Sequence, residues 1–128
     1  MSSWQELGID SLKAAKTLHG KRLWRSSASR AYYAAYSAVT AEIVARNPKQ
    51  SFRHGWRNPA HGELPRYVRE RLCHLPPQTR RSINTNLRLL YKLREDADYR
   101  PQASVDEQTA TMSCRVASAV FRELRVNE

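Results

Sequence analysis

The sequence contains little glycine and few of the residue pairs that form tight turns between strands. It has four glycines in 128 residues, no Asn-Gly or Asp-Gly pair, and no sustained alternation of apolar and polar residues. Hairpins with two-residue loops depend on such pairs, and half-buried strands depend on that alternation. The pattern therefore argues against a sheet-based fold and predicts an all-α protein.

Long apolar runs are also missing. No segment approaches the roughly 18 consecutive apolar residues that a membrane-spanning helix requires. The first residues, Met-Ser-Ser-Trp-Gln-Glu-Leu, lack the basic and then apolar pattern of a secretion signal. We therefore expect a cytoplasmic protein that does not associate with membranes.

Cysteine is scarce. Cys73 and Cys114 lie far apart, and neither belongs to a Cys-X-X-Cys pair or to a spaced set of cysteines and histidines. A disulfide framework or a zinc site needs more such residues at closer spacing, and His74 beside Cys73 is weak support for a metal. We expect two reduced, partly buried thiols, no metal site and no cofactor.

Acidic residues are outnumbered by basic ones. The formal net charge is +10, and arginine outnumbers lysine 17 to 5. Residues 11–41 hold six basic residues and no acidic one, and residues 46–81 hold nine basic residues and two acidic ones. Clustered positive charge is typical of a surface that binds nucleic acid, because it neutralises phosphates and releases their counterions. A basic face in solvent, or an acidic protein partner, would give the same pattern.

Helical periodicity extends over most of the chain. We predict one domain, residues 1–128, with four long helices over residues 3–18, 26–46, 77–97 and 105–125 and a short helix that begins after Gly62. A long basic connection covers residues 46–62, and connections of this length tend to be functional or mobile. These elements indicate an antiparallel up-and-down four-helix bundle with one additional short helix.

The helix over residues 26–46 is expected to be the most buried. It carries adjoining stripes of small and large apolar residues that together cover more than half of its circumference. Ser26 or Ser27 is the expected N-cap. Glu42 falls on the alanine stripe, where it could pair with Arg94 or reach past the helix end to water.

The first and last helices have predicted inner faces and a predicted cap. Leu7 and Met112 fall on the faces expected to point into the core. Ser104 and Glu107 have the spacing of a capping box, in which each side chain accepts a hydrogen bond from a free amide of the other residue.

An arginine interrupts the apolar stripe of the helix over residues 77–97. Helical spacing places Arg94, with Asp98 beside it, on one stripe with four apolar residues, Ile83, Leu87, Leu90 and Ala97. Burying an unpaired charge is costly, so we expect Arg94 to have a carboxylate partner, to line a cleft, or to face another chain that carries an anion. Each alternative makes this segment the best candidate for a functional site.

Two segments carry a family resemblance. They are Ser29-Arg30-Ala31-Tyr32-Tyr33-Ala34-Ala35-Tyr36 and Leu93-Arg94-Glu95-Asp96-Ala97-Asp98-Tyr99. They resemble the paired signatures of a small-protein branch of the HEPN superfamily (higher eukaryotes and prokaryotes nucleotide-binding domain). His61-Gly62-Glu63-Leu64, which lies between them, is also similar to that branch, and the order of elements resembles it from about residue 4 to residue 125.

The resemblance implies a helical bundle that forms a homodimer with its motif helices facing one another. Many HEPN proteins are metal-independent ribonucleases, toxins whose antitoxin is often a nucleotidyltransferase, or components of antiviral defence. We therefore expect an RNA- or nucleotide-binding protein that could be such a ribonuclease. A catalytically inactive HEPN partner or antitoxin, and a structural helical adaptor, are the alternatives.

The catalytic motif of HEPN ribonucleases is an arginine followed, after four to six residues, by a histidine. Arg94 matches the arginine, and Tyr99 occupies the position of the histidine. Arg94 could stabilise the charge that develops on phosphorus. Tyr99 is a poor base at neutral pH because the reference pKa of tyrosine is about 10, which leaves Asp98 as the nearby group that ionises readily. Arg94, Asp98 and Tyr99 are the candidate catalytic residues.

Nucleic acid contacts are expected from the second helix and from the basic region. His61 is included because its position resembles one retained in this HEPN branch. The candidate binding residues are Arg30, Arg53, Arg57, His61, Arg66, Arg69 and Arg71.

Overall fold

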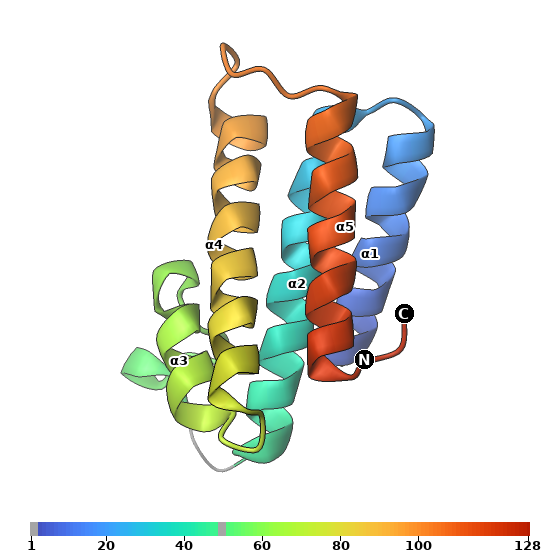
Figure 1. Ribbon diagram of the computed structural model, residues 1–128. Coiled ribbons are helices and arrows are strands. Elements are labelled where there is room, and N and C mark those ends of the chain that lie inside the picture. Colours follow the sequence, from blue (N-terminus) through green and yellow to red (C-terminus); the bar gives the residue numbers. More distant parts are fainter. Residues whose placement is uncertain (1–2, 49–50) are drawn as a thin grey trace.

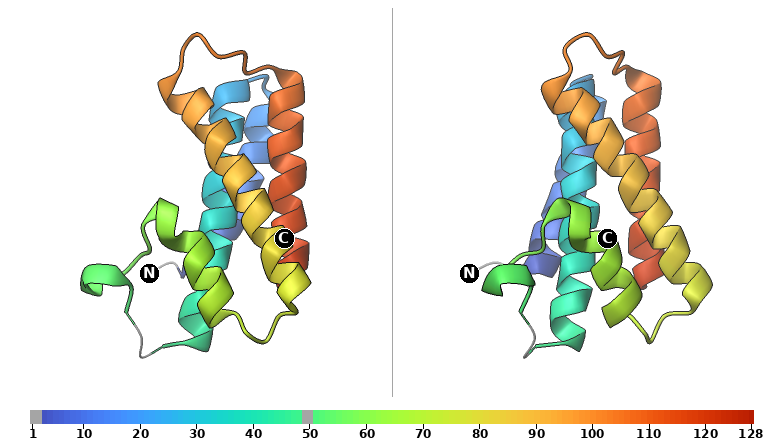
Figure 2. Two further views of the ribbon diagram at one scale, coloured as in Figure 1. Left: turned by 60° about the vertical axis from the view of Figure 1, so that its left-hand side comes forward. Right: turned by 90° about the vertical axis from the view of Figure 1, so that its left-hand side faces the viewer.

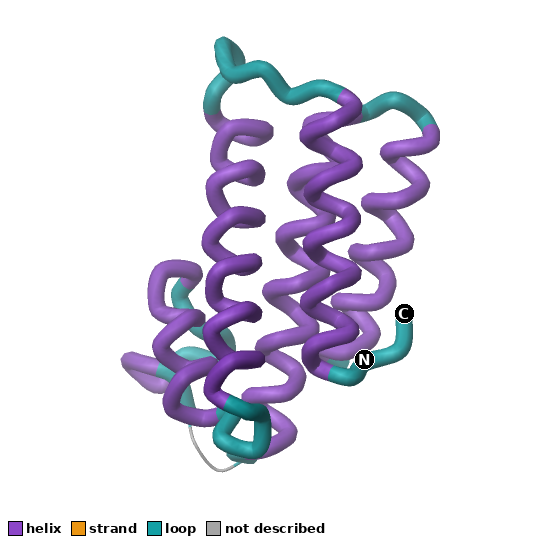
Figure 3. Tube along the Cα trace, viewed as in Figure 1, coloured by secondary structure: helices purple, strands orange, loops and turns teal. Residues whose placement is uncertain are grey.

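The computed structural model describes residues 3–48 and 51–128. Within this part of the chain all regular secondary structure is helical and loops connect the helices, which confirms the all-α prediction (Figures 1 and 3). The five α-helices found there are α1 (Trp4–Gly20), α2 (Trp24–Arg46), α3 (Leu64–Arg71), α4 (Pro77–Tyr99) and α5 (Glu107–Leu124). Two short 3₁₀ turns, η1 (Arg53–Gly55) and η2 (His61–Glu63), precede α3.

Helix α2 lies at the centre of the molecule. It packs against α1, α4 and α5, and α3 also contacts it (Figure 1). Most of its residues are buried, as its two apolar stripes predict. Gly8 of α1 lies so close to it that an added Cβ would be 3.1 Å from the backbone nitrogen of Ala38 and 3.2 Å from the carbonyl oxygen of Ala34. The small residues of α2 therefore permit close contact between the two backbones.

The ends of two helices differ from the prediction. Helix α2 begins at Trp24, and the side chain of Ser27 does not cap it; the Ser27 hydroxyl instead donates a 2.7 Å hydrogen bond to the carbonyl oxygen of Ala15 on α1. The capping box of α5 is formed by Asp106 and Thr109 rather than by Ser104 and Glu107. The two candidate capping boxes are only two residues apart. In the one that forms, the Asp106 carboxylate accepts a hydrogen bond from the backbone amide of Thr109.

The predicted inner faces of α1 and α5 are wrong at one residue each. Leu7 is 43% exposed and Met112 is 47% exposed, although both were expected in the core. On α1, the residues that face α2 are Gly8, Leu12 and Ala15. The apolar stripe of a helix is wider than the strip that a neighbour covers, so the residues at its edge stay in solvent.

The connection between α2 and α3 is more ordered than expected. It contains η1 and η2, and Phe52 is buried against Tyr67 of α3, with 5.0 Å between the ring centres. Lys49, which contributes to the basic region, lies outside the described residues. Figure 2 shows that α3 and the two turns lie beside the lower half of the molecule, next to α2 and α4. This arrangement brings His61 to the surface formed by α2 and α4.

Arg25, near the start of α2, holds the end of α4 and the loop that follows it. Its guanidinium donates hydrogen bonds of 2.7–3.1 Å to five backbone carbonyl oxygens, those of Asp96, Ala97, Arg100, Pro101 and Ala103. The last carbonyls of a helix lack partners within the helix and carry partial negative charge, so a cation placed there is doubly favourable. This contact fixes the turn of α4 that carries Asp98 and Tyr99.

Candidate functional site

Arg94 is buried between α2 and α4 and is held by side chains alone. It is 8% exposed. Its Nη2 donates hydrogen bonds to the hydroxyl oxygens of Tyr33, at 2.8 Å, and Tyr99, at 3.1 Å. Its Nε lies 3.1 Å from Oδ2 of Asp98, one helical turn along α4, but the N–H is not aligned for a hydrogen bond. Of the three expected environments, the carboxylate partner is therefore present within the same helix.

Aromatic rings surround the guanidinium of Arg94. Its central carbon lies 5.0 Å from the ring centre of Tyr99, 5.3 Å from that of Tyr33 and 6.0 Å from that of Tyr91. Burial disfavours charge on Arg94, but the oxygens of Tyr33, Tyr99 and Asp98 outweigh this effect and raise the pKa of Arg94 above its usual value. The site therefore contains a permanent cation enclosed by tyrosines.

Asp98 connects the two helices that form the site. Its Oδ2, the atom close to Arg94, also accepts a 3.0 Å hydrogen bond from the hydroxyl of Ser29 on α2. Of the two alternatives for Glu42, the pairing with Arg94 does not occur, because Glu42 lies at the far end of α2 and pairs with Arg46 at 3.8 Å. Asp98 is thus engaged by a cation and by a hydroxyl at the same oxygen.

Tyr99 covers the outer side of Arg94. It is the last residue of α4 and is 63% exposed. Its hydroxyl accepts a hydrogen bond from Arg94, so the ring lies between the buried guanidinium and solvent. A ligand that approaches Arg94 from this side would meet Tyr99 first.

His61 reaches the same group of tyrosines from η2. Its Nδ1 lies 2.6 Å from the hydroxyl of Tyr32, and its ring centre lies 4.9 Å from that of Tyr36 and 5.7 Å from that of Tyr91. Burial, and then the charge of Arg94, lower the pKa of His61, so the imidazole is neutral at pH 7. Burial also raises the pKa of Tyr32 far above its usual value, which keeps that hydroxyl protonated.

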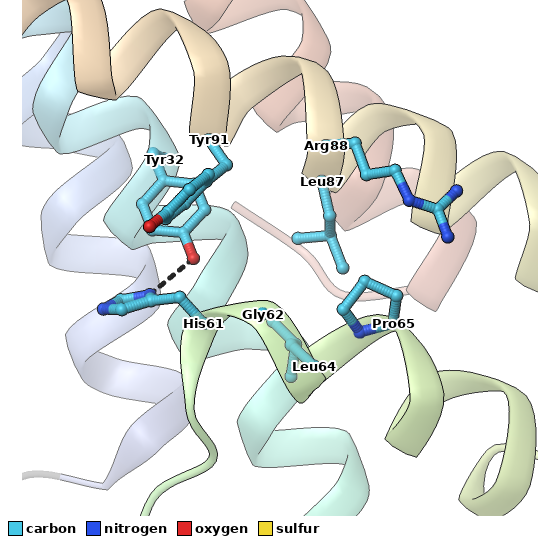
Figure 4. Close-up of a pocket in the computed structure, with 8 residues that line it drawn as sticks. All are labelled: Tyr32, His61, Gly62, Leu64, Pro65, Leu87, Arg88 and Tyr91. Carbon is cyan, nitrogen blue, oxygen red and sulfur yellow. Dashed lines mark hydrogen bonds between the residues drawn. The ribbon is translucent and has the colours of Figure 1, made fainter.

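A cavity of about 160 Å³ lies beside His61 (Figure 4). Residues of α4 form one side, and residues of η2 and the start of α3 face them from the other. The hydroxyl of Tyr36 donates a 2.6 Å hydrogen bond to the carbonyl oxygen of Pro59, and Asn84 donates a 3.0 Å hydrogen bond to that of Pro65, so both ends of the η2 segment are fixed. The cavity is lined by Tyr32, His61, Gly62, Leu64, Pro65, Leu87, Arg88 and Tyr91.

Comparison with known protein families identifies the architecture that carries this site. The family model of the HEPN domain matches residues 1–127. The chain belongs to the HEPN family. A search of curated proteins and a search of solved structures found no match.

The HEPN signature residues lie together in space. Arg94, Asp98 and Tyr99 are in mutual contact through Arg94, and Arg30 of the first signature lies near them, with its guanidinium carbon 5.4 Å from the ring centre of Tyr33. The site therefore joins both signature segments of this HEPN domain, and it adds His61 from the segment between them.

The other candidate binding arginines lie on the segment around α3. Three of them have partners within the chain. Arg53 pairs with Glu63 at 2.7 Å, Arg66 lies 3.6 Å from Glu63, and Arg71 stacks on Tyr67 with 4.6 Å from guanidinium carbon to ring centre. The remaining two, Arg57 and Arg69, are exposed.

Two residues of the site lie outside the segments that the sequence analysis singled out and were not predicted. Tyr91 lies one turn before Arg94 and contacts both Arg94 and His61, and Arg88 lies at the cavity. Helical spacing from Arg94 could have indicated Tyr91. Arg88 could not be found, because its role depends on where η2 folds back against α4.

The described residues form neither a membrane-spanning helix nor a cluster of metal ligands. Over residues 3–48 and 51–128, no helix is both long enough and apolar enough to cross a membrane. Among the same residues, no group of three or more His, Cys, Asp or Glu side chains is placed to hold a metal ion.

Proposed function

We propose that this HEPN protein binds RNA or a nucleotide, with a phosphate group at Arg94. The observation that carries the proposal is the state of that arginine. It is 8% exposed, its hydrogen bonds within the described residues all leave from Nη2, and its acceptors there are two tyrosine hydroxyls. A planar guanidinium with unused donors suits the bidentate recognition of phosphate.

Charge supports the same function. The chain carries a formal net charge of +10, and two exposed cations lie nearby: Arg30 is close to the ring of Tyr33, a partner of Arg94, and Arg88 lines the cavity beside His61. Arg57 and Arg69 are exposed on the neighbouring segment. A strongly basic surface attracts a polyanion and binds it in a salt-dependent manner. We propose that this surface guides RNA to the Arg94 site.

The proposal includes an assembly. We propose that the chain is a single-domain antiparallel four-helix bundle that forms a homodimer with the ends of its α4 helices facing each other, as the HEPN resemblance implies. Tyr99 is 63% exposed beside Arg94, and Leu23, at the start of α2, is 50% exposed. A two-fold contact here would place two Arg94 side chains near one ligand. We propose that the dimer acts in the cytoplasm.

Binding is tested by removing the buried charge. Arg94→Gln should weaken the binding of a short single-stranded RNA by tenfold or more, because one charge-assisted phosphate contact is lost. Arg115→Gln, on the exposed side of α5, is the matched control and should have little effect. Fluorescence anisotropy at several salt concentrations measures both. Affinity that does not depend on salt, or equal loss in the two variants, would contradict the proposal.

Metal-independent RNA cleavage is the second candidate function. The observation that favours it is His61, a neutral imidazole on the same tyrosine surface as Arg94. Such a protein would act as a toxin with a nucleotidyltransferase-type antitoxin or as a defence component. If the natural tyrosine at position 99, in place of the usual histidine, abolishes catalysis, the protein would be an inactive HEPN partner or antitoxin, or a structural adaptor.

Cleavage is tested by restoring the motif. Wild-type protein and Tyr99→His are incubated in excess with labelled RNA and a chelator, and Arg94→Gln in the Tyr99→His background is the control. Cleavage by Tyr99→His alone would mark the natural protein as an inactive HEPN domain. Cleavage by both would establish the ribonuclease. Intact RNA in every case would leave binding as the function.

A further inference from the structure

The cavity beside His61 has the size and lining of a site for one planar ring. It measures about 160 Å³. An apolar cavity of roughly 150 Å³ accommodates a benzene-sized molecule. Aromatic rings of Tyr32, His61 and Tyr91 form one end of the cavity, and Leu87 and Pro65 lie toward the other (Figure 4). Small-molecule sites combine such apolar walls with a few polar groups that fix orientation.

Cations lie on both sides of this cavity. Arg88, which lines it, is exposed on α4. Arg94 lies on the other side of Tyr91, with its guanidinium carbon 6.0 Å from that ring centre. Tyr91 therefore belongs both to the cavity wall and to the tyrosines around Arg94. A ring bound in the cavity would hold any anionic group attached to it near a positive charge.

The polar part of the cavity wall is held in place. His61 uses Nδ1 to contact the hydroxyl of Tyr32 at 2.6 Å, so its ring orientation is fixed. Its Nε2 makes no hydrogen bond with any of the described residues. The neutral imidazole can donate or accept there, depending on its tautomer, which suits the mixed donor and acceptor edge of a nucleobase.

We propose that this cavity binds the unpaired base of a nucleotide whose phosphate lies at Arg94. The inference rests on the proposed function and specifies its ligand: an aromatic ring joined to a phosphate, supplied either by a free nucleotide or by single-stranded RNA. Base-paired RNA is excluded as a ligand, because its bases are stacked and cannot enter the cavity. Stacking on Tyr91 supplies affinity that does not depend strongly on which base is bound.

The wall of the cavity can be altered without removing any side chain. Gly62 lines the cavity and an added Cβ there would meet no atom within 4 Å, so Gly62→Leu adds an apolar side chain to the wall without a clash. Gly20, at the end of α1, also has no atom within 4 Å of an added Cβ and lies outside the cavity lining. Gly20→Leu is therefore the matched control.

The first experiment compares ligands with and without a base. The ligands are AMP, ribose 5-phosphate, a short single-stranded RNA and the same RNA with one abasic position. Wild-type protein should bind at least one base-containing ligand about tenfold more tightly than its base-free counterpart, given the usual strength of base stacking. Gly62→Leu should remove this difference and leave the base-free ligands unchanged. Gly20→Leu should retain it, and Arg94→Gln should weaken ligands of both kinds.

A second measurement uses the wild-type protein alone. RNA that carries 2-aminopurine at one unpaired position should lose fluorescence on binding, because the base stacks against tyrosine. If RNA binds but shows neither quenching nor a difference from its abasic form, the cavity is not a base site, while the proposed phosphate site stands. If none of the four ligands binds, the proposed function fails and the base site fails with it.

Discussion

Two arginine side chains lie at the same end of the molecule and are held in different ways. Arg25 donates its hydrogen bonds to five backbone carbonyl oxygens at the end of α4 and in the following loop. Arg94, which is more deeply buried, contacts only side chains, and one of these, Tyr99, is 63% exposed. Backbone carbonyls cannot move away without unfolding the segment, whereas a tyrosine on the surface can.

Of these two arginines, Arg94 is the one available to a ligand. Arg25 binds backbone carbonyls at the end of α4 and in the following loop, where few partners within the helix remain. Arg94 interrupts an apolar stripe that would be continuous with a leucine in its place, and its partners are side chains rather than backbone groups of a helix end. Arg25 is a structural arginine, and the stability of the protein should depend on it far more than on Arg94.

The largest expected effect is the loss of Arg25. Arg25→Ala should lower the free energy of unfolding by about 3 kcal/mol, because five backbone carbonyls, three of them in partly buried contacts, lose a charged donor together. Arg115→Ala, an exposed change on α5, should alter it by less than about 0.5 kcal/mol. Urea denaturation followed by circular dichroism measures both. A loss below about 1 kcal/mol for Arg25→Ala would remove the distinction between the two arginines.

A smaller change in stability is expected at Arg94. Arg94→Leu should keep the free energy of unfolding within about 1 kcal/mol of wild type, because the leucine completes the apolar stripe and the desolvation cost of the charge disappears. The carboxylate of Asp98 keeps its hydrogen bond from Ser29 and its side chain is 29% exposed, so it is not left buried and alone. The same denaturation measurement applies. Destabilisation as large as that of Arg25→Ala would make Arg94 a structural residue as well.

The smallest effect concerns protonation. The charge of Arg94 helps to lower the pKa of His61, so Arg94→Leu should raise that pKa toward the ordinary value, with burial still holding it below. Arg115→Gln, far from His61 on α5, should leave it unchanged. Titration of the imidazole resonances by NMR measures this. A His61 pKa that does not move in Arg94→Leu would contradict the electrostatic link between the two residues.

The same shift sets a pH dependence of stability. Because the pKa of His61 is lower in the folded chain than in the unfolded chain, the unfolded chain takes up a proton first as the pH falls. The contribution of His61 to the free energy of unfolding is therefore fully present above the ordinary histidine pKa of about 6.5. It is lost as the pH falls from there through the lower pKa of His61 in the folded chain. In His61→Gln the free energy of unfolding should fall less over this range.

The sequence predicts the fold well where a pattern of residues is compatible with a single structural interpretation. The two apolar stripes of α2 predicted that it is the most buried helix, and the position of Arg94 on an apolar stripe indicated a buried charge; both predictions are confirmed. The order of the two signature segments identified the HEPN family, which the family model confirms.

Prediction failed where the result depends on a neighbouring element. Leu7 and Met112 fit a helical stripe, but only the packing of α1 and α5 decides which edge of the stripe is covered. The partners of Arg25 are backbone carbonyls, and every residue has one, so no pattern of side chains reveals them. The sequence left two alternatives open for Glu42, because charge alone does not give the distance along α2 that separates it from Arg94.

The contact between Arg25 and α4 has a further consequence for the end of that helix. Terminal helical turns usually fray, since their last carbonyls have no partner and their opening costs little. The side chain of Arg25 binds the last turn of α4 to the start of α2 at Asp96, Ala97 and Arg100, so this turn cannot unwind without breaking contacts between the two helices. Asp98 and Tyr99 thus stand on a helix end whose local opening is coupled to the loss of tertiary structure.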